Sequence, residues 1–411
     1  MRSLRTSDLL ILSIGTFTLG IDGFVLSGLL PQVAASLHVA VSTAGQLTTL
    51  FALVYALGSP VIAALTGNWD RRVLLAAGMT VFVVGVVVQA TGPSFAVVAA
   101  GRVLAALGAA GYQATAYSTA GILSDDEHRA RALAVVAGGS SLALVAGLPF
   151  GILIGQVWGW RTAMWVLVVL AALSALAVRA LPPAYAPRLS LGQRGRALAD
   201  RRVLAILIGT VTVLTPGFLA IAYLPAIIGT SGTWVVIAML AYGAGQVGGT
   251  TVVPRLIRRH SAKTALAAGA SGVTAALAIL AATRTVPAAA AVTMAALGVA
   301  VGLTIVPQQH RLFATIPALA PVAVGLNGSA IYVASALGAG LGGLALANGG
   351  PAGPPITAAA IGVLAIIIAI AAAPERMTHN AQRGTAARAG GRARTLAVAR
   401  YVGSRSRRVA R

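Results

Sequence analysis

Asp22 is the residue of this sequence best placed to do chemistry inside a membrane. It lies near the middle of residues 11–31, an apolar stretch long enough to cross a bilayer as a helix. The chain has eight acidic residues, and all the others lie in polar connections, at or beyond the ends of apolar stretches. A carboxylate at the bilayer centre costs about 2.5–3.5 kcal/mol on insertion scales, so it usually faces a cavity and has a function. We expect Asp22 to bind and release a proton; the alternative is a polar residue that only packs helices.

Arg102 is the natural partner of this carboxylate, because it alone of the 30 basic residues lies within an apolar stretch. Asp22 lies about 21 Å along an outward helix from Asp8, and Arg102 about 10 Å along an inward helix from Phe95, at 1.5 Å per residue. Both residues therefore reach a similar depth in a hydrocarbon core of about 30 Å. Burial favours the neutral form of a carboxyl group and a nearby cation favours its charged form, so the shape of a cavity could load and unload a proton. The alternative for Arg102 is a side chain that extends to the interface or caps backbone carbonyls.

The elements that must position these residues are apolar stretches that recur along almost the whole chain. With 58% hydrophobic and 9% charged residues and a mean hydropathy of +0.88, the composition excludes an ordinary soluble protein. We expect an all-α polytopic membrane protein with helices at about 8–30, 41–66, 73–91, 95–122, 132–157, 162–181, 203–228, 234–254, 264–283, 286–306, 320–347 and 354–373. Pro31 is expected to end the first helix, which leaves residues 32–39 as a connection at the outer face.

The basic residues indicate the orientation of these helices. All of them except Arg102, Arg161 and Arg284 lie on the side shared by both termini. The positive-inside rule therefore places both termini in the cytoplasm. The same distribution accounts for the net charge of +22 without nucleic acid, which we do not expect as a partner.

The longest polar interruption and an internal repeat indicate two halves. Leu75-Ala76-Ala77-Gly78 recurs as Leu266-Ala267-Ala268-Gly269, and the same shift carries Gly147 onto Gly338. The expected parts are a six-helix bundle over 1–181, a basic cytoplasmic linker over 182–202, a second six-helix bundle over 203–373 and a disordered cytoplasmic tail over 374–411. The Arg-rich tail either lies on the anionic cytoplasmic leaflet or is a solvated extension.

The sequence resembles the major facilitator superfamily over residues 7–375, in particular its twelve-span drug:proton antiporter branch. The runs GFVLSGLLPQVA (23–34) and AGQLTTLFALVYALGSP (44–60) are similar to bacterial chloramphenicol, sugar and nucleoside exporters. Residues 67–72 resemble the superfamily's loop between spans 2 and 3, and GRVLAALGAAG (101–111) its span-4 arginine motif. GGSSLALVAGLPFG (138–151), followed by Gly159-Trp160-Arg161, resembles the span-5 antiporter motif. Many relatives carry the span-1 acid one residue later, where this chain has Gly23.

The resemblance implies roles for two groups of residues and a bacterial-type plasma membrane as the location. Asp22 and Arg102 would couple transport to protons. The conformational switch would consist of Gly67, Asp70, Arg71, Arg72, Gly147, Pro149 and Gly151. For Arg71 and Arg72 the alternative is a topology signal only.

Polar side chains within the spans are few. They are Gln46, Tyr55, Tyr112, Gln113, Tyr117, Tyr223, Tyr242, Gln246, Asn327 and Tyr332. The candidates for the substrate cavity are Tyr55, Tyr112, Gln113, Tyr223 and Asn327. A cavity with so little polar lining suits an amphipathic or drug-like solute, so we expect a monomeric, proton-coupled exporter that works by alternating access. The alternative is an exporter of a metabolite such as a sugar, nucleoside or amino acid. The spans show no Ser/His/Asp set, paired carboxylates or metal-ligand cluster, so we expect no enzyme activity, cofactor or metal.

Overall fold

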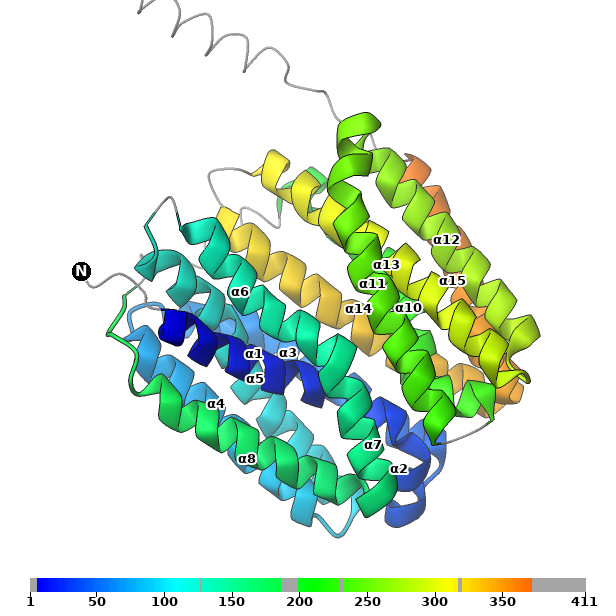
Figure 1. The fold of residues 1–411 in the computed structure, drawn as a ribbon, viewed down its shortest axis with the longest axis horizontal. Coiled ribbons are helices and arrows are strands. Elements are labelled where there is room, and N and C mark those ends of the chain that lie inside the picture. The colour runs from blue at the N-terminus through cyan, green and yellow to red at the C-terminus, as the bar shows by residue number, and fades with distance from the viewer. Residues whose placement is uncertain (1–5, 126–127, 186–198, 230–231, 317–319, 372–411) are drawn as a thin grey trace, which may run out of the picture. The chain divides into compact units, whose positions relative to one another are not determined.

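The computed structural model describes residues 6–125, 128–185, 199–229, 232–316 and 320–371 (Figure 1). Within these ranges every regular element is a helix, which confirms the expected all-α class. Eleven segments are long and apolar enough to cross a membrane, and the last of them, Gly325–Ile370, contains two helices in succession. The described part of the chain therefore has twelve helical crossings.

The helices of the N-terminal half occupy the lower left of Figure 1. They are α1 (Thr6–Gly28), α2 (Leu30–Leu37), α3 (Val41–Leu65), α4 (Arg71–Thr91), α5 (Phe95–Leu123), α6 (Arg129–Leu142), the π-helix η1 (Ala143–Gly147), α7 (Leu148–Trp158) and α8 (Trp160–Val178). The elements α6, η1 and α7 follow one another without a break and form one crossing.

The helices of the C-terminal half occupy the upper right of the same view. They are α10 (Arg201–Ile228), α11 (Thr233–Arg259), α12 (Ala262–Thr283), α13 (Pro287–Thr315), α14 (Ala320–Gly349), the 3-10 turn η3 (Gly350–Ala352) and α15 (Gly353–Ala371). Contacts between α3 and α14 and between α1 and α10 join the two sets into one compact unit. The division at 181 and 203 stays a prediction, and the expected tail and most of the linker lie outside the described residues.

The alternating direction of the helices gives the molecule two faces. We call the face with Thr6, Arg71, Arg129, Arg201 and Arg259 the basic face. The opposite face carries the turns at Gly92, Gly159, Gly229 and Arg284. Twelve crossings bring Ala371 back to the face of Thr6, so the described chain begins and ends on the basic face.

The first connection differs from the prediction. Residues 32–39 were expected to form a connection without a helix, but Leu30–Leu37 is the short helix α2. Pro31 lies in its first turn, where a backbone N–H would have no helical acceptor and the fixed φ of proline favours the helix. The break falls instead at Leu29, whose φ of −114° and ψ of 8° leave the helical region. Pro31 therefore begins a helix rather than ending one.

Two helices of the C-terminal half are longer than predicted. We expected ends at about 254 and 306, whereas α11 runs to Arg259 and α13 to Thr315. Hydropathy locates the part of a helix inside the hydrocarbon core, and a helix can continue beyond it into polar sequence. Arg258 and Arg259 lie in the last turn of α11, where cations interact favourably with the helix dipole.

Small residues bring α4 and α5 into backbone contact at the depth of Arg102. A Cβ added at Gly101 would lie 2.7 Å from the carbonyl oxygen of Gly85 and 2.8 Å from Cγ of Gln89. Glycine at such positions lets helix backbones approach closely. The approach places the buried side chain of Gln89 beside the turn of α5 that carries Arg102.

Candidate functional site

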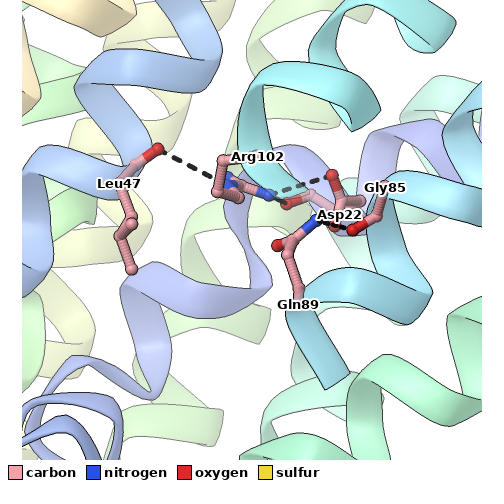
Figure 2. A network of polar contacts seen from close by, with 5 residues as sticks. All are labelled: Asp22, Leu47, Gly85, Gln89 and Arg102. Atoms are coloured by element: carbon pink, nitrogen blue, oxygen red, sulfur yellow. Dashed lines mark hydrogen bonds and ion pairs between the residues drawn. The ribbon is translucent and has the colours of Figure 1, made fainter. Parts of the chain in front are cut away.

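Asp22 of α1 and Arg102 of α5 form an ion pair in the interior of the N-terminal half (Figure 2). Arg102 Nη1 lies 2.9 Å from Asp22 Oδ2, and both side chains are fully buried. The same nitrogen donates to the backbone carbonyl of Asp22 at 3.3 Å. The two residues thus share one depth, as expected from their positions in the sequence, and their role in proton coupling stays a prediction.

Helix α3 supports the arginine from the other side. Nε of Arg102 donates to the carbonyl oxygen of Leu47 at 3.4 Å, and the guanidinium carbon lies 4.4 Å from the centre of the Phe51 ring. A cation over an aromatic face is attracted by the ring quadrupole, most strongly where water is excluded. Arg102 is therefore in contact with α1 through Asp22 and with α3 through Leu47 and Phe51.

The pair does not use all of its hydrogen-bonding capacity. Among the described residues, Asp22 Oδ1 and Arg102 Nη2 have no hydrogen-bond partner. Buried polar groups are normally paired, and leaving one unpaired costs about 1–3 kcal/mol. The ion pair is therefore less stable than one with all its hydrogen bonds. Oδ1 can accept a proton or a new donor, and Nη2 can gain a new acceptor, without losing an existing bond.

Gln89 of α4 is a third polar residue at this depth, and the sequence analysis missed it. Its side chain is fully buried and donates through Nε2 to the carbonyl oxygen of Gly85 at 3.3 Å. Figure 2 shows the amide beside the Asp22–Arg102 pair. Its position inside an apolar stretch was the available signal, of the same kind that pointed to Asp22.

A cavity of about 160 Å³ lies between the two halves of the chain. It is lined by Phe24, Leu144, Leu214, Gly217, Phe218, Ile221, Tyr242, Gln246, Val301, Ile305, Ile331, Tyr332 and Ser335. Phe24 of α1 and Phe218 of α10 stack across it with ring centres 5.6 Å apart and planes within 3°. The lining offers the hydroxyl groups of Tyr242, Tyr332 and Ser335 and the amide of Gln246, and it includes no charged side chain.

A second cavity, of about 310 Å³, lies between α1, α7 and α8. Its lining includes Phe17, Ile21, Leu142, Phe150 and Leu167 and contains no polar side chain. Phe150 and Leu142 are exposed at its edge, where a bilayer would cover them. The cavity between the halves is the better candidate for a solute site, because only that one combines apolar walls with hydrogen-bonding groups.

The comparison with known families decides what class of protein carries this site. The family model described as Major Facilitator Superfamily matches residues 12–320. The chain belongs to the major facilitator superfamily. It is therefore a multi-pass membrane transporter that acts on a small molecule, and it is not an enzyme.

Individual relatives within the superfamily agree with this assignment. The chain is 36% identical over 272 residues to a chloramphenicol resistance protein of Streptomyces lividans, covering 64% of this chain and 69% of that one. It is 32% identical over 261 residues to a chloramphenicol efflux pump of Mycobacterium tuberculosis, covering 62% of this chain and 63% of that one. The crystal structure of the nucleoside transporter NupG superposes with a TM-score of 0.72 over 89% of this chain and 100% of that one, at 12% identity.

The loop that resembles the superfamily's motif between spans 2 and 3 connects three segments on the basic face. Asp70 caps α4: its Oδ1 accepts from the backbone N–H of Arg72 at 2.9 Å and from that of Ala184, which follows α8, at 3.2 Å. Arg71 donates through Nη2 to the carbonyl oxygen of Gly67 at 3.1 Å. Its backbone N–H donates to the carbonyl oxygen of Ala184 at 2.8 Å. The loop therefore joins α3, α4 and the end of α8.

The motif in the fifth crossing lies between the two halves of the transporter. Gly147 ends η1, and a Cβ added there would lie 2.5 Å from Cγ1 of Ile21 in α1. Pro149 occupies the first turn of α7, and a Cβ at Gly151 would lie 2.8 Å from Cγ2 of Val25. On the other side, a Cβ at Gly243 of α11 would lie 2.9 Å from Cα of Val145 in η1. The motif thus packs against the helix of Asp22 and against the C-terminal half.

The five residues predicted for the substrate cavity do not line the cavity between the halves, and their role in binding stays a prediction. Tyr55 stacks on Tyr332, which lines the cavity. The other four are in interior contacts: Tyr112 donates to the carbonyl oxygen of Leu12, Gln113 to the hydroxyl of Ser140, Tyr223 to the carbonyl oxygen of Ala339, and Asn327 is buried in α14. None of the five is a lining residue of the cavity between the halves. Tyr242, Gln246 and Tyr332, which do line it, were visible in the sequence only as polar residues within spans.

Proposed function

We propose that this transporter exports small, neutral, amphipathic drug-like molecules, chloramphenicol among them, in exchange for protons. The observation that carries the proposal is the fully buried Asp22–Arg102 pair, whose Asp22 lies on the same helix, α1, as Phe24 of the cavity wall. The proposed location is a bacterial plasma membrane, with the basic face and both termini in the cytoplasm and the chain acting as a monomer.

Asp22 is the proton carrier in this proposal. Arg102 stabilises the carboxylate, and burial favours the neutral acid, so a change in access to water shifts the balance between the two forms. Return of one proton across the membrane supplies about 2.3 kcal/mol per 100 mV. Because about 1.4 kcal/mol corresponds to a factor of ten, one proton sustains a roughly 40-fold gradient of a neutral solute. A single carboxylate is therefore sufficient.

The cavity supports a neutral, partly aromatic substrate. A charged molecule would lose its hydration among lining residues that offer no opposite charge, at a large cost in free energy. Flat apolar groups can pack against the rings of Phe24 and Phe218, and Tyr242, Gln246 and Ser335 can bond amides and hydroxyls. Two relatives named for chloramphenicol resistance or efflux support the same substrate class.

Alternating access explains why the cavity is small. Its volume of about 160 Å³ is below the roughly 300–1,000 Å³ of a typical small-molecule site. Its walls come from both halves, so separation of the halves enlarges it. In this conformation the halves are in contact through Phe24 and Phe218, and a Cβ added at Gly343 of α14 would lie 2.8 Å from Nε2 of Gln46 in α3. These contacts lie between the middle of the helices and the opposite face, so we assign the conformation to a state closed toward the outside.

The alternative hypothesis is export of a metabolite such as a sugar, nucleoside or amino acid. A free sugar presents many hydroxyl groups, and each one that leaves water without a partner costs free energy. The cavity offers four hydrogen-bonding side chains among thirteen lining residues, too few for a polyol. The cavity therefore favours the drug-like substrate.

A resistance profile tests the substrate class. The gene is expressed in a bacterial strain deprived of its own exporters, and growth is measured against chloramphenicol, other neutral antibiotics and cationic dyes. The expected result is resistance to chloramphenicol and no protection against permanent cations, with Asp22→Asn, which should lose uphill export, as the matched control. Protection against cations alone, or growth effects only with sugars or nucleosides, would contradict the proposed substrate class.

A further inference from the structure

The ion pair and the cavity are connected by three aromatic rings. Phe51 and Tyr55 lie one turn apart on α3, and Tyr332 reaches them from α14. The ring centres of Tyr55 and Tyr332 are 3.6 Å apart with planes at 26°, and those of Phe51 and Tyr332 are 6.4 Å apart. Arg102 lies on the face of Phe51. A continuous path of contacts therefore runs from Asp22 through Arg102 and the rings to the C-terminal half.

Tyr332 belongs to both sites at once. Its side chain lines the cavity, and it also lies within electrostatic range of Asp22 and Arg102. Because it lines the cavity, its side chain can contact a solute there. The other titratable side chains around Tyr332 are Tyr55, on which it stacks, and Tyr117 of α5.

The contacts suggest how a proton could change the cavity. When Asp22 gains a proton, Arg102 loses its counter-charge and retains the Phe51 face and the backbone carbonyls of Leu47 and Asp22 as partners. A guanidinium that moves toward Phe51 displaces the ring under it, and Tyr332 is packed on the same stack. Tightly packed side chains transmit such shifts because little free volume separates them.

We propose that Tyr332 couples the proton site to the substrate cavity, by moving with the Phe51–Tyr55 stack when the charge of Asp22 changes. Tyr332 is a positioning residue in this scheme, since the transported proton binds Asp22. The inference rests on the proposed role of Asp22. Coupling between two sites is reciprocal, so a solute in contact with Tyr332 changes the proton affinity of Asp22 by the same factor.

A cysteine in the cavity wall tests this coupling without any substrate. Ser335 lines the cavity one turn from Tyr332, and the chain has no native cysteine, so Ser335→Cys gives one reactive thiol. The full-length protein in lipid nanodiscs is treated with a maleimide, and the modification rate is compared with and without Asp22→Asn, which mimics the protonated acid. Typical coupling factors are about 5–150, so we expect the two rates to differ at least about fivefold.

The variants at Tyr332 decide the outcome. Tyr332→Leu removes the stacked ring and should reduce the rate ratio to near one, whereas Tyr332→Phe keeps the ring and should keep the ratio. Phe218→Leu is the matched control, because Phe218 lines the same cavity but stacks on Phe24. An unchanged ratio in Tyr332→Leu, or equal rates with and without Asp22→Asn, would overturn the proposal.

A second measurement covers the case in which Asp22→Asn does not fold. The Ser335→Cys rate is then followed as the pH is lowered and is divided by the rate at Asn348→Cys, an exposed position near the opposite face. We expect the ratio of the two rates to change with pH, and this change to be absent in Tyr332→Leu. A ratio that still changes with pH in Tyr332→Leu would refute the coupling. Failure to export chloramphenicol would contradict only the proposed substrate, because neither thiol measurement uses it.

Discussion

At the scale of single residues, the Asp22–Arg102 pair is better explained by function than by stability. Desolvation of two charges costs several kcal/mol per ion, and well-packed apolar residues often stabilise a protein as much or more than a buried pair. Here one oxygen of Asp22 and one nitrogen of Arg102 are also without partners among the described residues. A pair with this geometry is ready to exchange its partners, which a proton-coupled transporter requires.

Substitution of Arg102 should separate the contribution of charge from that of geometry. Arg102→Leu leaves the Asp22 carboxylate buried without a partner, and breaking a buried pair in this way costs about 3–5 kcal/mol. Arg102→Lys keeps the charge but cannot contact Asp22 and Leu47 at the same time, as the planar guanidinium does. We therefore expect a smaller loss of stability than in Arg102→Leu.

Thermal unfolding of the purified variants in detergent measures both effects. The double variant Asp22→Asn with Arg102→Leu is the control, because it removes both charges. It should be more stable than Arg102→Leu alone, with strongly non-additive effects, as for groups in one network. Additive losses would show that the two side chains do not support each other.

At the scale of elements, close contact between α4 and α5 positions the arginine. A Cβ at Gly85 would lie 2.8 Å from Cα of Ala105 and 2.8 Å from the carbonyl oxygen of Gly101. Both obstacles are backbone atoms of α5, which cannot move aside as a flexible side chain can. The separation of the two helices therefore depends on glycine at this position, and Arg102 lies one residue beyond one of the contact points.

Gly85→Ala should consequently force α4 and α5 apart and disturb the site. Overpacking in a close-packed interior costs about 1–3 kcal/mol, and we expect a loss of that size together with slower transport. Gly138→Ala is the matched control: it lies in α6 of the same half, and a Cβ there meets nothing within 4 Å. Alanine should be neutral or stabilising at 138, by about 0.5–1 kcal/mol from helix propensity. Equal effects at 85 and 138 in thermal unfolding would contradict the close-contact explanation.

The sequence was sufficient to predict the two residues of the ion pair but not the residues that line the cavity between the halves. A charge deep in an apolar stretch is costly wherever it points, so Asp22 and Arg102 could be singled out without knowing the packing. Which side of a helix faces a cavity depends on rotation about its axis, and one residue changes that direction by about 100°. In helices rich in Ala and Gly the apolar residues surround the axis, so Tyr242 and Tyr332 could not be distinguished from Tyr112 and Tyr223. Pro31 was misread because a proline favours the first turn of a helix as much as it disfavours the interior.

At the scale of the whole molecule, the twelve crossings of the described residues and the positions of the basic residues predict an orientation in the membrane. Alternating helices place Arg71, Arg129, Arg201 and Arg259 on one face, whereas Arg161 and Arg284 lie on the other. Arg161 is used structurally there: it donates to the carbonyl oxygen of Gly92 at 2.8 Å and packs on Trp160. The excess of positive charge predicts that the basic face is cytoplasmic.

Single cysteines can test this orientation directly, because the native chain has none. His260→Cys lies just beyond α11 on the basic face, and Asn348→Cys lies near the opposite face, and both positions are exposed. A membrane-impermeant thiol reagent applied to intact cells should modify position 348 and leave 260 unmodified until the membrane is opened. Modification of 260 in intact cells would reverse the assigned orientation.

The central claim is that Asp22 carries the proton that drives export, and its most direct test is pH-driven transport in vesicles. Purified protein is reconstituted into liposomes, and labelled chloramphenicol is followed both with an imposed pH gradient and as exchange at equilibrium. The unsubstituted protein should accumulate the drug against its gradient, whereas Asp22→Asn, which cannot release a proton, should retain exchange and lose uphill transport. Uphill transport by Asp22→Asn at the rate of the unsubstituted protein would contradict the account.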